Sequence, residues 1–292
     1  MKPTVLHLWF CGLLLLSIGL FHGPLSDLKG LTLQNGPYAH VLLIPLISAA
    51  LIYRARHEIF RETRPCPAIG LPLVAIGIVA YYRINAHWVV LRPADRLSLA
   101  VCALVLVWAA GFILCYGLRP FRNSIFPLAF LFFTVPLPAV LLEKAVAVLQ
   151  AGSADLTYVI FRALGVPVLR HGLVFSLPGV EIEIAQQCSG IRSSMALFIT
   201  SILAGHLVLT SAWRRALLGA ASIPIVIFKN ALRIVGISWL GIYVDPQFLY
   251  GRLHHEYGGL VFSLVAIGIL VPLLFVLHRS ERSIKRAPAH TS

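Results

Sequence analysis

The stretch EIEIAQQCSGIRSSMALFI (residues 181–199) joins three kinds of sequence. The alternating EIEIA predicts a short strand, the apolar run from Ile191 predicts a helix, and a polar segment holding Cys188 lies between them. Because the helix begins at about Ile191, Cys188 and Ser189 fall at its N-terminal end. Unpaired backbone N–H groups and the helix dipole favour negative charge there. A thiolate is stabilised in such a position.

The composition of the whole chain is that of an integral membrane protein. Of its 292 residues, 59% are hydrophobic and only 12% are charged, and the mean hydropathy is +0.87. A helix that crosses a bilayer core needs about 20 apolar residues. We therefore predict an all-α polytopic membrane protein that forms a single transmembrane domain over residues 1–292. Its expected spans lie at roughly 4–22, 38–54, 67–83, 97–116, 123–142, 191–210, 216–236 and 258–278.

The basic residues predict the orientation of these spans. If the N-terminus is cytoplasmic, the inside segments collect thirteen of the 24 Lys and Arg residues, namely Lys2, Arg54, Arg56, Arg61, Arg64, Arg119, Arg122, Arg214, Arg215, Arg279, Arg282, Lys285 and Arg286. We expect a multi-pass protein of the cytoplasmic (inner) membrane with both termini in the cytoplasm. Topology and anionic lipid headgroups account for the net charge of +13. Membrane lipid is therefore an expected partner and nucleic acid is not.

The longest segment outside the predicted spans, residues 143–190, changes its period. Its first part, up to about residue 165, has helical spacing but carries several charges, which predicts an amphipathic helix lying in the membrane interface. Its second part alternates with a period of two and is interrupted by Gly172 and Gly179, which predicts one or two short hairpins. This small helix and hairpin insertion leads to Cys188 on the extracytoplasmic side.

The five cysteines do not form a disulfide framework. Cys11, Cys102 and Cys115 fall within predicted spans, and Cys66 borders a cytoplasmic loop. Only Cys188 is expected to face outward.

Two further polar groups are expected at the same outer boundary as Cys188. Asn230 and Arg233 are three residues apart and share one face of the helix predicted at 216–236, and His255 directly precedes the last helix. A thiol can attack a carbonyl, a histidine can carry protons, and an arginine can offset thiolate or oxyanion charge. The predicted topology thus brings together the groups of a thiol-dependent active site.

Three blocks of sequence, QQCSGIRSS (186–194), NALRI (230–234) and HHEYGGLVF (254–262), resemble in this order the signature blocks of the exosortase/archaeosortase family. YAHVLLIPLISAALIY (38–53) resembles an early span of the same family. By this resemblance Cys188 is the nucleophile, Arg233 stabilises the thiolate or oxyanion, and His255 is the general acid and base. We prefer His255 to His254 because the family places its histidine four residues before a glycine, here Gly259.

The resemblance, and not the composition, also implies the reaction. It implies a bacterial-type exosortase, a membrane-embedded cysteine endopeptidase and transpeptidase that acts on exported proteins with a C-terminal transmembrane sorting signal. That signal consists of a Pro-Glu-Pro type motif, a hydrophobic helix and a basic tail (PEP-CTERM). A thioester on Cys188 would pass to an acceptor or to water. No cofactor is expected.

The residues around Cys188 allow more than one role. Ser189, beside Gly190, is expected to cap the helix rather than to act as a nucleophile. Arg192 could offset the thiolate charge, bind a substrate carboxylate, or be an ordinary interfacial charge. A metal site is not expected, because the two histidines and the single outward thiol are scattered along the sequence.

The residues of the helix predicted at 216–236 also allow two roles each. Asn230 either braces Arg233 or His255 by a hydrogen bond or packs helices together. Lys229 and Arg233 could instead extend to lipid headgroups, and His254 is expected to be an interfacial anchor.

Two other classes of function stay open. In a transporter, Arg233 and His255 would line a substrate or proton path, and a membrane acyltransferase could use the same thiol. The polar residues gather at one membrane face, and no inverted repeat is found. Both observations favour the peptidase over the transporter, and the composition does not distinguish the peptidase from an acyltransferase.

Overall fold

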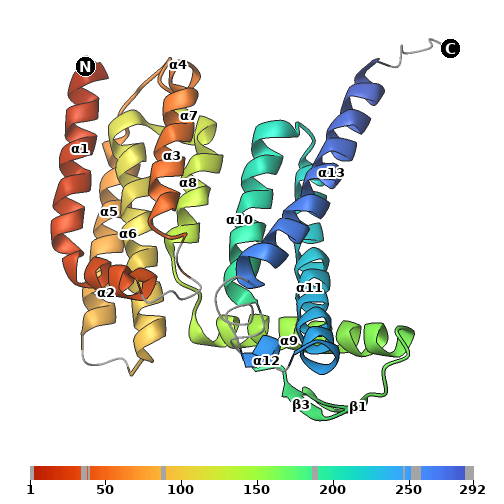
Figure 1. Ribbon diagram of the computed structural model, residues 1–292. Helices are drawn as coiled ribbons and strands as arrows, with labels where there is room; N and C mark the ends of the chain where they lie inside the picture. The colour runs from red at the N-terminus through yellow and green to blue at the C-terminus, as the bar shows by residue number, and fades with distance from the viewer. Residues whose placement is uncertain are drawn as a thin grey trace. The chain divides into compact units, whose positions relative to one another are not determined.

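The computed structural model describes residues 3–33, 38, 40–86, 90–185, 190–245, 247–250 and 258–286, and most of them are helical (Figure 1). In chain order the elements are α1 (Pro3–Leu20), α2 (His22–Leu33), α3 (Leu43–Arg54), α4 (Arg56–Ile59), α5 (Pro67–Asn85), α6 (Pro93–Tyr116), α7 (Leu118–Asn123), α8 (Ile125–Phe130), η1 (Leu131–Thr134), α9 (Ala139–Ala163), β1 (Leu169–His171), β2 (Val174–Leu177), β3 (Val180–Glu183), α10 (Ile191–Val208), α11 (Ala212–Tyr243), α12 (Gln247–Tyr250) and α13 (Gly258–Arg286).

The prediction of an all-α polytopic membrane protein is confirmed, although the number of spans differs. Within the described ranges, five helices are long and apolar enough to cross a membrane: α5, α6, α10, α11 and α13. The number rises to seven if α1 with α2, and α8–η1 with α9, each count as one bent span. We expected eight. The run predicted at 38–54 forms α3, whose 12 residues are fewer than a bilayer core requires.

The span predicted at 123–142 is not one straight helix. It bends by 87° between Ile125–Thr134 and α9, and the break contains Pro136 and Pro138, which have no backbone N–H to continue a helical ladder. The N–H of Ala139 instead donates to Asp95 Oδ1 at 2.7 Å. A carboxylate from α6 thus satisfies the new helix N-terminus.

Residues 1–142 and 143–292 form two compact units. In the first unit, α6 is largely buried and holds α1 through polar contacts within an apolar core. Trp108 Nε1 donates to Ser17 Oγ at 2.9 Å, and His7 Nδ1 shares a hydrogen bond of 2.8 Å with the Tyr116 hydroxyl. Polar side chains between helices in a membrane have no water to hydrogen-bond, so hydrogen bonds between the helices are favourable.

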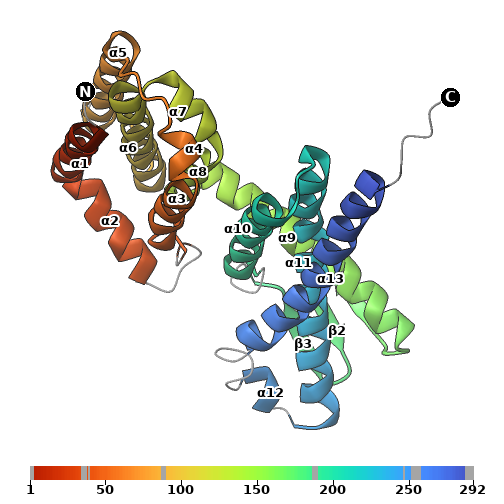
Figure 2. The ribbon, with the colours of Figure 1, turned by 90° about the horizontal axis from the view of Figure 1, so that it is seen from above.

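In the second unit, α10, α11 and α13 pack together around an apolar core (Figures 1 and 2). Strands β1, β2 and β3 form an antiparallel sheet in that order, with turns at Gly172 (φ 65°) and Gly179 (φ 77°). These are the two hairpins predicted from the period of two. Phe175 of the sheet packs with Phe161 of α9 and Val235 of α11, so the sheet covers the region where these two helices meet.

A buried carboxylate joins the end of α13 to the turn between α10 and α11. Glu281 is 4% exposed. It accepts hydrogen bonds from Thr210 N at 3.0 Å, from Thr210 Oγ1 at 3.1 Å and from Ser211 N at 2.8 Å. It also pairs with Arg214 at 3.5 Å. Because these N–H groups precede the first turn of α11, Glu281 caps that helix from a distant part of the chain.

Replacing Glu281 by glutamine is expected to lower the midpoint temperature of unfolding in detergent by several degrees. The substitution leaves the Arg214 guanidinium buried without its counter-charge, which is a strongly destabilising change. Arg282→Gln removes an exposed charge from the next position of α13 and serves as the control. If both variants unfold at the wild-type temperature, the Glu281 contacts do not stabilise the second unit.

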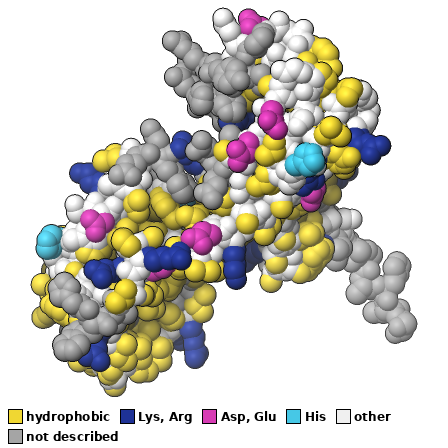
Figure 3. All heavy atoms as spheres, turned by 90° about the horizontal axis from the view of Figure 1, so that it is seen from below, with side chains coloured by type: hydrophobic (Ala, Val, Ile, Leu, Met, Phe, Trp, Pro, Cys, Tyr) yellow, Lys and Arg dark blue, Asp and Glu magenta, His cyan; other side chains and the backbone are white. Residues whose placement is uncertain are grey.

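The exposed surface is rich in large apolar side chains. Leu16 on α1 is 76% exposed and Phe275 on α13 is 63% exposed, and hydrophobic side chains cover much of the face in Figure 3. Water would disfavour such a surface, whereas lipid would not. The outward-facing apolar side chains therefore agree with the membrane location predicted from composition.

Candidate functional site

The predicted site residues divide into two groups. Cys188, Ser189 and His255 lie outside the described residues, as does His254. The structure describes Gly190, Arg192, Asn230, Arg233 and Gly259, the last in the first turn of α13. The structure therefore describes five of the eight predicted site residues.

The first turn of α10 is organised around the carbonyl group of Gly190. This oxygen accepts hydrogen bonds from Ser194 N at 2.9 Å, from Ser194 Oγ at 2.8 Å and from Ser193 Oγ at 2.9 Å. Gly190 occupies the N-cap position with φ 71° and ψ 18°. We expected Ser189 to be the cap, but the N-cap position belongs to Gly190 and Ser189 precedes it.

Gly190 also lies against the middle of α11. A Cβ atom at this position would be 3.3 Å from Asn230 Oδ1, 3.5 Å from Lys229 Nζ and 3.5 Å from Ser193 Oγ. A positive φ and close neighbours both favour glycine here. Two of the predicted site residues, Gly190 and Asn230, are thus brought together.

Asn230 is completely buried and packs helices together, one of its two expected roles. Its Nδ2 donates to Ser153 Oγ on α9 at 3.1 Å, and Ser153 is completely buried as well. The hydrogen bond joins α11 to α9 directly beneath Gly190.

A buried polar face on α9, formed by Gln150, Ser153 and Thr157, supports the same region. Gln150 Nε2 donates to the carbonyl oxygen of Ile184 at 2.8 Å. Residues 186–189 are therefore bounded by two anchored points, Ile184 on one side and Gly190 on the other.

Lys229 is the most deeply buried cation near Gly190. It is 2% exposed, and its Nζ donates a hydrogen bond to Ser193 Oγ. Of the two roles left open for Lys229, extension to lipid headgroups does not apply, because its ammonium group points to the first turn of α10. Sequence reasoning did not assign this residue to the site.

Arg233 is half-buried one turn beyond Lys229 on α11, and Arg192 on α10 is exposed. Arg233 follows Lys229 by four residues and therefore shares a face of α11 with it. One turn further along α11, a Cβ at Gly236 would lie 3.7 Å from the ring of Phe262 on α13. The first turns of α13 therefore meet α11 beside Arg233. His255 precedes the first residue of α13 by three positions.

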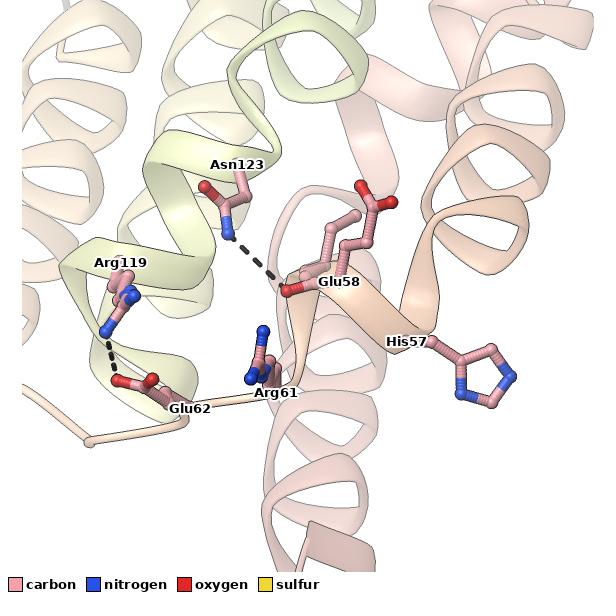
Figure 4. A pocket seen from close by; sticks show the side chains of 7 residues that line it. His57, Glu58, Arg61, Glu62, Arg119 and Asn123 are labelled. Carbon is pink, nitrogen blue, oxygen red and sulfur yellow. Dashed lines mark hydrogen bonds and ion pairs between the residues drawn. The ribbon is translucent and has the colours of Figure 1, made fainter.

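A pocket in the first unit contains none of these residues. It has a volume of about 350 Å³, and its lining is His57, Glu58, Ile59, Arg61, Glu62, Arg119 and Asn123. Figure 4 shows Arg119 and Glu62 pointing toward each other as an ion pair, with His57 pointing away from them. Asn123 Nδ2 donates to the Glu58 carbonyl at 3.5 Å. These two contacts join α4 and the segment that follows it to α7.

Comparison with known families agrees with the three sequence blocks. A family model described as transmembrane exosortase matches residues 32–271, a range that includes QQCSGIRSS, NALRI and HHEYGGLVF. No curated protein and no solved structure matches the chain. The match covers more than half of the 292 residues and confirms the resemblance. The chain belongs to the transmembrane exosortase family.

Proposed function

We propose that the protein is a membrane-embedded cysteine endopeptidase and transpeptidase that removes the C-terminal sorting signal of exported proteins. The signal would be a Pro-Glu-Pro type motif followed by a hydrophobic helix and a basic tail. Family membership supports sorting-signal processing. The observation that carries the proposal is the proximity of Gly190 to Lys229 and Asn230, which sets the chain two residues after Cys188 beside a cation and an amide of α11.

The proposed reaction has two steps in which atoms and charges balance. The Cys188 thiolate attacks the scissile carbonyl carbon, the C–N bond breaks, and the amine of the sorting signal leaves with a proton from His255. The exported protein is then held as a thioester. Water or an acceptor amine attacks this thioester after giving a proton to His255, and the Cys188 thiolate is released.

Arg233 is proposed to offset the charge of the thiolate and of the tetrahedral intermediate. It follows Asn230 by one turn on α11, and the first turns of α13 meet the next turn of the same helix. The three blocks are therefore supplied by neighbouring helix segments in the second unit. We place this site on the extracytoplasmic side of the inner membrane, with both termini in the cytoplasm, on the basis of the basic residues. This placement needs an even number of spans, so one of the two bent helix pairs would cross the membrane and the other would not.

Loss of the basic tail from a co-expressed substrate would test the proposal. The substrate carries an N-terminal tag, a Pro-Glu-Pro motif, an apolar helix and a basic tail with a second tag. Cells that contain the protein are expected to convert the doubly tagged substrate to the singly tagged form, and cells without it are not. A substrate from which only the motif is removed is the matched control. Equal tail loss with and without the protein would contradict the proposal.

A further inference from the structure

We propose that the first unit binds an anionic phospholipid, with an acyl chain in an aromatic pocket beside α3 and the phosphate on the neighbouring arginines. The aromatic pocket has a volume of about 510 Å³, which is within the range of about 300–1,000 Å³ typical of small-molecule sites. It is lined by residues of α1, α3, α4 and α6 and by Phe60, all of which belong to the first unit. The inference is therefore independent of Cys188 and of the proposed reaction.

The floor of the aromatic pocket is well packed and apolar. The rings of Phe60 and Tyr116 have centroids 4.8 Å apart, and those of Phe112 and Tyr116 are 4.7 Å apart. The Tyr116 hydroxyl shares its hydrogen bond of 2.8 Å with His7 Nδ1, so these two polar groups satisfy each other. The rings therefore offer an apolar surface, which favours contact with an acyl chain over contact with water.

Arg56 and His57 place polar groups in the lining of the same pocket. The Arg56 guanidinium carbon lies 4.2 Å from the centre of the Tyr53 ring, and Nη1 donates to the Tyr53 carbonyl oxygen at 3.0 Å. A guanidinium group has five N–H donors, so Arg56 retains donors for a ligand. His57 also lines the polar pocket of about 350 Å³ that contains Arg61 and Arg119. The aromatic pocket and the polar pocket thus adjoin at His57.

Positive charge predominates around the two pockets. Six arginines and two glutamates lie within residues 54–64 and 117–123, at the end of the first unit that holds α4 and α7 (Figure 1). Glu62 pairs with Arg119. Among the described residues, no ion pair joins a carboxylate to Arg54, Arg56, Arg61, Arg64 or Arg122. One further carboxylate, Glu58, is therefore left to balance five arginines.

The other acids of the first unit lie away from this end. Asp95 is in the first turn of α6 and Tyr116 is the last residue of that helix, so its 24 residues separate them by about 30 Å. Asp27 lies on α2, which follows the opposite end of α1 from His7. The residues of the first unit outside the described ranges include no Asp or Glu. The first unit therefore has no other carboxylate for these arginines.

The ligand that suits the two adjoining pockets has an apolar chain joined to an anionic group. A phospholipid with a net negative headgroup has this structure, and its phosphate accepts charge-assisted hydrogen bonds from arginine. The basic residues predict that this end of the unit faces the cytoplasm. The cytoplasmic leaflet carries anionic lipids, and basic pockets between helices on that side bind their headgroups.

Lipid binding to the purified full-length protein tests the inference. The protein in a non-ionic detergent is titrated with phosphatidylglycerol, and the bound fraction is measured by native mass spectrometry. Phosphatidylglycerol is expected to bind about tenfold more tightly than phosphatidylcholine with the same acyl chains. Arg56→Gln is expected to weaken its binding about five- to tenfold. Arg122→Gln, the matched control, changes an exposed arginine that lines neither pocket and is expected to leave binding unchanged.

Ala49→Trp tests the acyl-chain pocket without a change of charge. Ala49 lines the aromatic pocket, whereas its neighbour Ala50 is also exposed but does not line it. A tryptophan at position 49 occupies part of the pocket and is expected to weaken phosphatidylglycerol binding at least about fivefold, because fewer methylene groups are buried. Ala50→Trp is expected to bind like the wild type. Thermal unfolding and gel filtration check each variant, and Arg61→Gln replaces Arg56→Gln if the latter aggregates.

Equal weakening by Arg122→Gln and Arg56→Gln would overturn the inference, because a diffuse surface potential would then explain the binding. Wild-type affinity in Ala49→Trp, or equal affinity for phosphatidylcholine, would overturn it as well. If glycerol phosphate, which has no acyl chain, competes as strongly as phosphatidylglycerol, the pockets bind phosphate and not a lipid. If Ala49→Trp changes the oligomeric state in gel filtration, the aromatic pocket is an interface between copies of the chain and the inference fails.

Discussion

Replacing Cys188 by alanine is expected to lower the rate of sorting-signal cleavage by at least about 10³-fold, because removal of a covalent nucleophile abolishes the step on which the other groups act. The rate is measured as loss of the tail tag in membranes that contain equal amounts of enzyme. Cys102→Ala, which changes a half-buried thiol within α6, is expected to cleave at close to the wild-type rate.

Near wild-type cleavage by Cys188→Ala would contradict the thiol mechanism. Cysteine in an apolar protein is often an inert small side chain, and such a result would return Cys188 to that role. If no variant and no wild-type protein cleaves the substrate, the transporter alternative gains support, because Lys229 and Arg233 would then be intramembrane charges without a covalent reaction to serve.

Gly190→Ala is expected to slow cleavage about 100-fold, because small displacements of a reacting group have effects of this size. A Cβ at Gly190 would meet Asn230 Oδ1 at 3.3 Å while the backbone is held at φ 71°. Left-handed geometry costs a non-glycine residue about 1–2 kcal/mol. If the backbone shifts to relieve the close contact or the positive φ, the first turn of α10 is expected to move. The segment that carries Cys188 would then move with it.

Gly179→Ala is the matched control for this substitution. Gly179 has φ 77°, but a Cβ there would meet no atom within 4 Å. The two variants therefore carry similar backbone strain and differ in what the new methyl group contacts. Thermal unfolding is expected to change to a similar extent in both, whereas cleavage falls only in Gly190→Ala. Equal activity in the two variants would show that Gly190 does not position the nucleophile.

Hydropathy predicted most helices of the fold, because an apolar segment that spans a membrane must satisfy its own backbone hydrogen bonds and an α-helix does so. It failed where the backbone, and not side-chain polarity, decides the structure. A hydropathy window over 123–142 does not register that Pro136 and Pro138 lack an N–H, although their absence ends the helix. The turn glycines of the sheet were predicted, because alternation with a period of two and its interruptions are both visible in the sequence.

The sequence predicted a helix that begins beside Gly190 and a polar helix face at Asn230, and the structure brings these two residues together. The site was not predictable on α9, which was expected to be an amphipathic helix lying in the membrane interface, whereas Gln150 and Ser153 are buried within the protein. Their spacing defines a face, but it does not say whether water, lipid or protein covers that face. Lys229 was missed for the same reason, since a lysine that extends to headgroups and one that points into a site have the same sequence.

The thioester itself is the most direct test of the account. Purified enzyme is mixed with an excess of substrate, quenched with acid within the first turnover, and digested for mass spectrometry. The account predicts that the peptide containing Cys188 carries the substrate segment that ends at the cleavage site, and that hydroxylamine removes it. An acyl group on any other residue, or cleavage in the first turnover with no acyl group on Cys188, would contradict it.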